Sequence, residues 1–177
     1  MSDPTRRHLV LVGLMGAGKS TVGALCAARL GRPFVDTDEL VEVLAGGSVA
    51  EVFAQGEETF RALERDAVAD VSTSPAPLVI GCGGGAVLDA RNRSQLHQHG
   101  FVVWLRADPA VLADRVASDR VDRPLLARGR PVVVLTELAS ARMAAYEAAA
   151  DASVATDDRT PDQVADAVLE EFARCAA

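Results

Sequence analysis

The sequence predicts an α/β protein, in which helices cover a parallel β-sheet. Two observations support this fold class. Short apolar runs alternate with segments of helical periodicity along the 177 residues, which is the order that strand-helix-strand units require. The apolar runs also lack the two-residue alternation of a half-exposed strand, as expected for strands buried on both faces of a parallel sheet. Ligands of such sheets bind at the carboxyl ends of the strands.

The first half of the chain supplies three expected strands and three expected helices. Each helix carries apolar residues at helical spacing and ends at helix-breaking residues. Gly31 ends the first helix, the pair Gly46 and Gly47 ends the second, and Pro75 ends the third. We expect strands at residues 8–12, 33–36 and 78–80, and helices at residues 18–30, 39–45 and 49–71.

The second half repeats this order with less regular spacing. Apolar runs predict strands at residues 101–105 and 152–155, and helical periodicity predicts helices around residues 91–99 and at residues 161–174. No linker rich in Gly, Ser or Pro divides the chain, so we expect residues 1–177 to form a single domain.

Composition excludes several classes of function. The formal net charge of -7 argues against a general nucleic-acid or membrane-surface binder, because such proteins need a basic face. The sequence contains no apolar run long enough to span a bilayer and no apolar core of a signal peptide, so we expect a cytoplasmic protein. Separately, we expect the protein to act as a monomer. Three widely spaced cysteines argue against zinc and disulfide frameworks, and Cys26 is expected to be a small buried side chain.

A phosphate-binding loop follows the first strand. Gly13, Gly18, Lys19 and Ser20 fit the pattern Gly-x4-Gly-Lys-Ser/Thr between a buried strand and a helix. Backbone N–H groups of such a loop surround phosphate oxygens, and the helix start adds its positive dipole end. The expected nucleotide contacts are Gly16, Ala17, Gly18, Lys19, Ser20 and Thr21.

Lys19 is the only lysine in the chain, beside 17 arginines. A compact ammonium suits the β- and γ-phosphates, whereas a planar guanidinium fits the loop poorly, so Lys19 is a candidate catalytic residue. Ser20 is expected to ligate Mg²⁺ through its hydroxyl. A GTPase would need a second lysine in its guanine-reading motif, and this chain has none.

Two carboxylates end the second expected strand. Asp36 is suited to the Mg²⁺ shell, while Asp38 is suited to orient an acceptor hydroxyl in line with the γ-phosphorus. Taken alone, this Asp-Thr-Asp segment is as consistent with a turn or with the N-cap of a helix. Phe53 and Phe60 are equally compatible with a wall of the acceptor pocket and with plain core.

Taken together, these motifs resemble shikimate kinase in order and spacing, from about residue 9 to residue 161. The resemblance rests on the phosphate loop, the Asp-Thr-Asp segment, the stretch Ser48-Val-Ala-Glu-Val-Phe53 with Gly56-Glu57 and Phe60-Arg61, the loop Gly83-Gly-Gly-Ala86, and Arg123-Pro-Leu-Leu126. It implies a P-loop kinase fold whose five-stranded parallel sheet has the order 2-3-1-4-5.

The resemblance also implies roles for individual residues. Shikimate would be bound by Asp38, Arg61, Gly83, Gly84, Gly85 and Arg142. Fork-shaped guanidinium groups suit the single carboxylate of shikimate, and Glu64, one turn after Arg61, is placed to hold that arginine. Arg123 would approach the nucleotide phosphates as a catalytic residue, and Arg159 would lie near the adenine.

An arginine-rich segment at residues 115–130 has five arginines among its sixteen residues, a composition that suits a mobile cationic lid. Two positions depart from the family pattern. Ala144 stands where the family usually has Pro. Gly81 stands where many members have a small hydroxyl residue or Ala, which puts a water-mediated Mg²⁺ contact in doubt.

The function expected from these residues is transfer of the ATP γ-phosphoryl group to the 3-hydroxyl of shikimate, with Mg²⁺ as cofactor, in the pathway to chorismate and the aromatic amino acids. Two alternatives remain at this point. One is a P-loop kinase for another small hydroxylated acceptor, such as gluconate or an amino relative of shikimate. The other is a nucleotide-dependent binding module that has lost catalysis.

Overall fold

The computed structural model describes residues 7–119 and 124–176. Its strands are β1 (His8–Val12), β2 (Phe34–Asp36), β3 (Val79–Gly81), β4 (Gly100–Arg106) and β5 (Ala152–Ala155). Its α-helices are α1 (Lys19–Leu30), α2 (Thr37–Ala45), α3 (Val49–Gln55), α4 (Glu57–Ser72), α5 (Ala90–His99), α6 (Pro109–Ser118), α7 (Pro131–Ala149) and α8 (Pro161–Ala176). Two 3₁₀ turns, η2 (Ala86–Leu88) and η3 (Pro124–Arg128), complete the described elements.

The five strands form one parallel sheet in the order β2-β3-β1-β4-β5, as the family resemblance implies. β1 lies at the centre, where Leu9 pairs with Val79 on one side and with Phe101 on the other. All five residues of β1 are buried. This burial on both faces explains the unbroken apolar run in the sequence.

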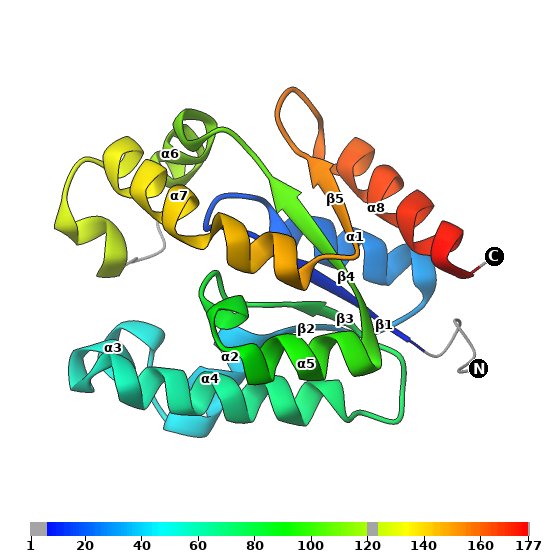
Figure 1. Ribbon diagram of the computed structural model, residues 1–177, viewed down its shortest axis with the longest axis horizontal. Helices are drawn as coiled ribbons and strands as arrows, with labels where there is room; N and C mark the ends of the chain where they lie inside the picture. The colour runs from blue at the N-terminus through cyan, green and yellow to red at the C-terminus, as the bar shows by residue number, and fades with distance from the viewer. Residues whose placement is uncertain (1–6, 120–123, 177) are drawn as a thin grey trace.

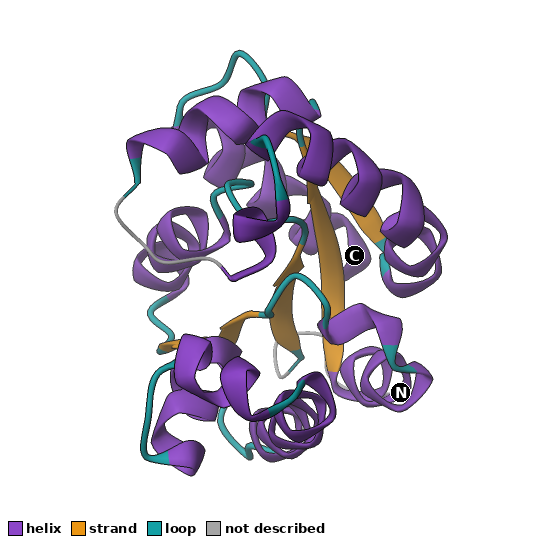
Figure 2. Cartoon of the chain, turned by 90° about the vertical axis from the view of Figure 1, so that its left-hand side faces the viewer, coloured by secondary structure: helices purple, strands orange, loops and turns teal. Residues whose placement is uncertain are grey.

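Helices cover both faces of the sheet. α1 packs against α8 on one face, while α4 and α5 pack together on the other (Figure 1). Turning the molecule by 90° shows the sheet between these layers (Figure 2). The main core fills both interfaces, and a smaller apolar cluster of Val41, Val52, Phe60 and Ala67 joins α2, α3 and α4.

The expected strands are all present, and their ends differ from the prediction by one residue at most. The helix expected at residues 49–71 is wrong in one respect, because it is two helices that meet at Gly56. Gly56 has a φ of 131°, a conformation that side-chain-bearing residues rarely adopt, so the backbone turns there. The first of these two helices, α3, starts with a capping box in which the side chains of Ser48 and Glu51 accept from each other's backbone amides.

Two helices, α6 and α7, were not predicted from the sequence. α6 includes residues 115–118, so the first part of the segment expected to form a lid is a regular helix. Residues 124–128 form the turn η3, and α7 begins at Pro131. No helix of the described chain is both long and apolar enough to cross a membrane.

Candidate active site

A large pocket opens at the carboxyl ends of the strands, with a volume of about 1020 Å³. Fourteen of the residues expected from the sequence to bind ligands or metal line it. These are Gly16, Ala17, Gly18, Lys19, Ser20, Thr21, Asp36, Asp38, Arg61, Gly83, Gly84, Gly85, Arg142 and Arg159. Arg123, the remaining expected residue, lies outside the described residues. The volume is in the range of small-molecule sites.

The phosphate loop connects β1 to α1 and has the backbone that its glycines predict. Gly16 and Gly18 have φ values of 80° and 92°, so both adopt left-handed conformations that favour glycine. Gly18 is the residue before the first turn of α1, and no side chain caps that helix end. The amides of the first turn therefore face the pocket as donors for an anion.

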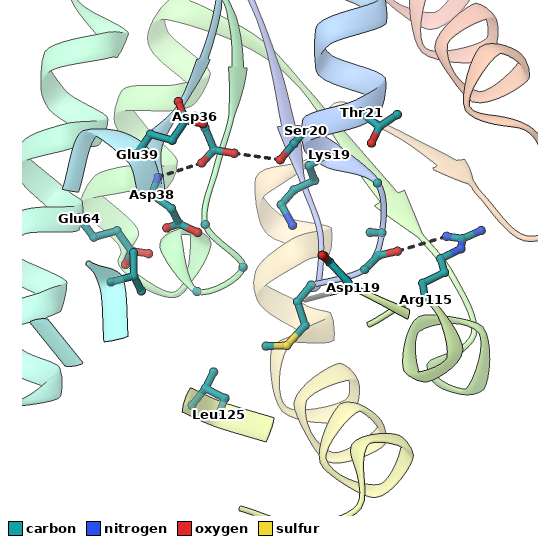
Figure 3. A pocket seen from close by; sticks show the side chains of 18 of the residues that line it. Lys19, Ser20, Thr21, Asp36, Asp38, Glu39, Glu64, Arg115, Asp119 and Leu125 are labelled. Carbon is teal, nitrogen blue, oxygen red and sulfur yellow. Dashed lines mark hydrogen bonds between the residues drawn. The ribbon is translucent and has the colours of Figure 1, made fainter. Parts of the chain in front are cut away.

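The ammonium of Lys19 lies across this loop. Its Nζ donates hydrogen bonds to the carbonyl oxygens of Gly13 at 2.9 Å and of Leu14 at 3.0 Å. Figure 3 shows Lys19 pointing into the pocket between the loop and the carboxylates of Asp36 and Asp38. The one lysine of the chain thus lies at the centre of the site.

Asp36 caps the N-terminus of α2 and also contacts Ser20, the other residue expected to bind Mg²⁺. Its Oδ1 accepts from the amide of Asp38 at 2.9 Å and caps α2, while its Oδ2 accepts from the Ser20 hydroxyl at 3.0 Å (Figure 3). The two interpretations of this carboxylate, helix cap and site residue, are therefore compatible.

Asp38 directs its carboxylate into the pocket. Burial raises the pKa of Asp38 to about 6, and the negative charge of Asp36 adds to this shift, while Lys19 and Arg61 oppose it. A carboxyl with a pKa close to neutral is a suitable proton acceptor for a hydroxyl group during phosphoryl transfer.

Arg61 and Glu64 form an ion pair on α4, as their spacing predicts. Arg61 Nη1 lies 2.7 Å from Glu64 Oε2, and Glu57 makes a second, longer contact with the same guanidinium at 3.3 Å. Glu64 is only 2% exposed, and burial raises its pKa against the opposing effect of Arg61. The pair fixes the guanidinium at the pocket wall.

The phenylalanines beside this arginine serve both as core and as pocket wall. Phe53 and Phe60 line the pocket, and their ring centroids lie 4.5 Å apart. Phe60 also belongs to the smaller apolar cluster. Arg61 lies over both rings, at 5.9 Å from the centroid of Phe53 and 5.2 Å from that of Phe60.

The triple-glycine loop after β3 is crowded by side chains at its first and third positions, Gly83 and Gly85. A Cβ at Gly83 would lie 2.5 Å from Asp38 Oδ1, and a Cβ at Gly85 would lie 2.4 Å from Arg61 Nη1. The glycines therefore let the loop backbone approach these two side chains closely. Arg142, buried on α7, reaches the same loop and donates to the carbonyl of Gly84 at 2.9 Å.

Three residues that contact this site were assigned no role from the sequence. Thr37 is fully buried, and its Oγ1 accepts from the amide of Gly83 at 3.0 Å. Tyr146 donates to the carbonyl of Gly84 at 2.6 Å. Arg115 donates to the carbonyl of Gly16 at 3.3 Å and, through its other nitrogen, to the carbonyl of Thr156 at 2.8 Å.

Arg115 thereby joins the phosphate loop to the segment that follows β5, where the exposed Arg159 borders the pocket. Figure 3 shows Arg115 on α6, bonded to the loop. Because its guanidinium is bonded to both of these segments, Arg115 is held in place beside the phosphate loop. The lid expected at residues 115–130 therefore does not begin at Arg115.

Comparison with known proteins agrees with this geometry. The family model for shikimate kinase matches residues 15–173. Shikimate kinase of Symbiobacterium thermophilum is 48% identical, over 93% of this chain and 95% of that relative. The chain belongs to the shikimate kinase family. A solved structure of shikimate kinase from Acinetobacter baumannii in complex with shikimate has a TM-score of 0.91 and 34% identity, and the match covers 97% of this chain and 96% of that one.

A gluconokinase from Sinorhizobium meliloti resembles the chain more distantly. Its TM-score is 0.65 at 19% identity, over 97% of this chain and 94% of that one, so the likeness extends to the fold alone. Membership of the shikimate kinase family therefore rests on the relatives of higher identity, whose similarity extends over nearly the whole chain.

Proposed function

We propose that the protein transfers the γ-phosphoryl group of ATP to the 3-hydroxyl of shikimate, giving shikimate 3-phosphate and ADP. The observation that carries this proposal is the shared pocket, in which a phosphate loop and a cluster of acceptor-binding groups line one cavity. The reaction then belongs to the pathway from shikimate to chorismate and the aromatic amino acids. We also propose that residues 1–177 act as one monomeric kinase domain in the cytoplasm.

The donor end binds the triphosphate. The loop amides from Gly16 to Ser20 surround phosphate oxygens, Thr21 contacts the α-phosphate, and Lys19 neutralises charge on the β- and γ-phosphates. Arg159 contacts the adenine. Arg123 approaches the phosphates from a lid within residues 115–130, whose closure excludes the water that competes with the acceptor hydroxyl.

The acceptor end binds shikimate by its two kinds of polar group. Arg61 and Arg142 lie on α4 and α7, and their guanidinium groups suit one carboxylate between them. The amides of Gly84 and Gly85 add neutral donors, and Gly83, whose own amide bonds Thr37, brings the loop backbone close to the ligand. Asp38 accepts a hydrogen bond from the hydroxyl that reacts and holds it in line with the γ-phosphorus.

In the reaction, a bond forms between the 3-oxygen of shikimate and the γ-phosphorus as the bond to the β,γ-bridging oxygen breaks. The hydroxyl proton passes to Asp38 late, and the released electron pair stays on ADP. A loose transition state asks for little covalent chemistry from the protein, so positioning and charge neutralisation supply most of the rate.

Ser20 and Asp36 are the residues that would hold Mg²⁺. A hydroxyl and a carboxylate 3.0 Å apart are hard oxygen donors of the kind that this ion prefers. Among the described residues, no three His, Cys, Asp or Glu side chains gather to hold a metal by themselves. This suits a kinase, where Mg²⁺ takes its other ligands from phosphates and water. When bound, the ion neutralises charge on the transferred phosphoryl group.

A coupled assay of ADP release tests the proposed function against its alternatives. Purified protein with Mg²⁺ and ATP is supplied in turn with shikimate, an amino relative of shikimate, quinate, gluconate and nucleoside monophosphates. We expect saturable ADP release with shikimate at a kcat/KM at least about 10²-fold above that for quinate, gluconate and nucleoside monophosphates, because the rigid shikimate ring sets the separation between the carboxylate that meets the arginines and the hydroxyl that meets Asp38. Preference for gluconate would support the first alternative, and binding without turnover would support the second.

A further inference from the structure

The carbonyl of Gly84 is held by two donors from one helix. Tyr146 Oη donates to it at 2.6 Å and Arg142 Nη1 donates to it at 2.9 Å, both from α7. The hydroxyl and the guanidinium therefore meet at one carbonyl oxygen at the back of the triple-glycine loop.

The Tyr146 side chain is built into this position. It is 1% exposed, and its ring stacks on Trp104 of β4 with centroids 5.3 Å apart and planes 13° apart. Burial raises the pKa of Tyr146 to about 12, so the phenol keeps its proton and remains a donor at any working pH.

The fixed carbonyl of Gly84 also sets the direction of the Gly85 amide, because both groups belong to the same peptide unit. In a trans peptide the N–H of Gly85 points opposite to the carbonyl of Gly84, and the described chain has no cis peptide bond. The Gly85 amide therefore points away from α7. Within residues 7–119 and 124–176, the amides of Gly84 and Gly85 make no hydrogen bond to the protein. Both residues line the pocket.

Gly84 also lies close to the phosphate loop on the donor side of the pocket. A Cβ at Gly84 would lie 3.4 Å from the carbonyl oxygen of Gly13, the same oxygen that accepts from Lys19 at 2.9 Å. Glycine torsions are permissive, so this loop depends on its partners for a single conformation. The position of Gly84 therefore sets how the acceptor loop lies against the phosphate loop.

We propose that Tyr146 is a positioning residue of the acceptor site, whose hydroxyl orients both the Arg142 guanidinium and the amides of Gly84 and Gly85 toward the shikimate carboxylate and ring hydroxyls. This inference rests on the proposed function and adds a residue to it. Tyr146 does not line the pocket, so it acts through Gly84 and Arg142 and not by touching the substrate.

The test is Tyr146→Phe, which removes the hydroxyl and keeps the ring on Trp104. We expect the KM for shikimate to rise about tenfold, which is at the upper end of the effect of one lost hydrogen bond between neutral groups, with the KM for ATP within about twofold. Trp104 is the only tryptophan in the chain, so its fluorescence gives the shikimate Kd without turnover. That Kd should rise by the same factor.

Ser72→Ala is the matched control, because it also removes one buried hydroxyl but far from the pocket. Ser72 is 1% exposed, and its Oγ has no hydrogen-bond partner among the described residues. We expect unchanged shikimate KM and Kd in this variant. A merely structural role for Tyr146 would lower the melting temperature or the active fraction while leaving both constants at the wild-type values.

If Tyr146→Phe does not fold, fluorotyrosine provides a second route, since Tyr146 is the only tyrosine. Fluorination lowers the phenol pKa, so the shikimate Kd of the labelled protein should rise as pH rises through that pKa, and the Kd of unlabelled protein should not. Unchanged shikimate constants in both proteins overturn the inference while the wild-type activity stands. A wild-type protein that cannot phosphorylate shikimate overturns the proposed function as well.

Discussion

At the scale of single residues, the site depends on a few charges whose environment is unlike that of a protein surface. Lys19 is the clearest case, because a chain with 17 arginines keeps its only lysine in the phosphate loop. Its ammonium lies within hydrogen-bond reach of two loop carbonyls. A larger, planar guanidinium would not fit this position without moving the loop.

Lys19→Ala should lower kcat by a factor on the order of 10² to 10³, because the charge that neutralises the phosphates is lost. Lys19→Arg should also be impaired, since the charge alone does not suffice. Steady-state kinetics measure both effects, and circular dichroism should show an unchanged fold. Near-normal turnover in Lys19→Ala would remove Lys19 from the mechanism.

The pH dependence of the reaction should report Asp38. Because Asp38 must be ionised to accept the hydroxyl proton, kcat/KM for shikimate should fall about tenfold per pH unit below about pH 6, the pKa that burial gives this carboxyl. Asp38→Asn should be much slower and should lack this acidic limb. An acidic limb centred near pH 4 would contradict the role assigned to the buried carboxyl.

The same carboxyl should cost stability at neutral pH. Its folded-state pKa lies above the ordinary value of 3.8, so the folded protein binds the proton more tightly than the unfolded chain. The ionised carboxylate therefore destabilises the fold above about pH 6, by at most about 3 kcal/mol, and the cost disappears below about pH 4. Urea unfolding of Asp38→Asn should show a gain over wild type at pH 8 and none at pH 3.5.

At the scale of elements, Phe34 explains the departure of Gly81 from the family pattern. Its ring on β2 packs against two glycines, Gly23 of α1 and Gly81 of β3. A Cβ at Gly23 would lie 2.2 Å from Phe34 Cε2, and a Cβ at Gly81 would lie 3.1 Å from Phe34 Cζ. The aromatic ring thus occupies the space that side chains at these two positions would need.

Gly23→Ala should therefore destabilise the protein, although this exchange inside an exposed helix normally gains about 0.8 to 1 kcal/mol. The ring of Phe34 would have to move, at a cost of about 1 to 3 kcal/mol. Adding Phe34→Leu should recover most of the loss. Urea unfolding of the single and double variants measures this, and a stabilised Gly23→Ala variant would contradict the packing described here.

Local patterns explain why some elements were predictable and others were not. The strands and the phosphate loop follow from apolar runs and glycine spacing within about ten residues. α7 was missed because apolar residues such as Val133 and Met143 lie on its exposed side and obscure its periodicity. The start of α6 carries a usable signal, since Asp108 caps it and Pro109 opens it.

The contacts within the site likewise divide into those that the sequence could predict and those that it could not. The Arg61 and Glu64 pair was predictable, because both residues lie on one helix. Thr37 and Tyr146 contact loop residues that are 46 and 62 positions away in sequence. No spacing rule within one chain brings such partners together, so only the packed fold shows that they meet.

At the scale of the whole molecule, the donor and acceptor ends lie on different elements around the carboxyl edge of one sheet. The phosphate loop follows the central strand β1, Asp36 ends β2 and Asp38 comes just after it, and the triple-glycine loop follows the neighbouring strand β3. This arrangement lets the two substrates bind to separate groups. Their binding should therefore be separable by experiment.

Removal of Mg²⁺ provides that separation. With EDTA in excess, turnover should fall below detection, because Lys19 alone does not neutralise the charge that Mg²⁺ would offset on the triphosphate. The shikimate Kd measured by Trp104 fluorescence should change by less than about twofold, since the acceptor end uses arginines and backbone amides. Added Mg²⁺ should restore turnover. Persistent turnover in EDTA would contradict the metal role given to Ser20 and Asp36.

The position of the transferred phosphate is the most direct measure of the central claim, that one pocket presents the 3-hydroxyl of shikimate to the γ-phosphorus of ATP. Purified protein is incubated with Mg²⁺, ATP and shikimate, and the products are examined by mass spectrometry and ³¹P NMR. The account predicts one equivalent of ADP and a phosphate ester coupled to the proton on carbon 3. Phosphate on another hydroxyl, or ADP formed with free inorganic phosphate, would contradict it.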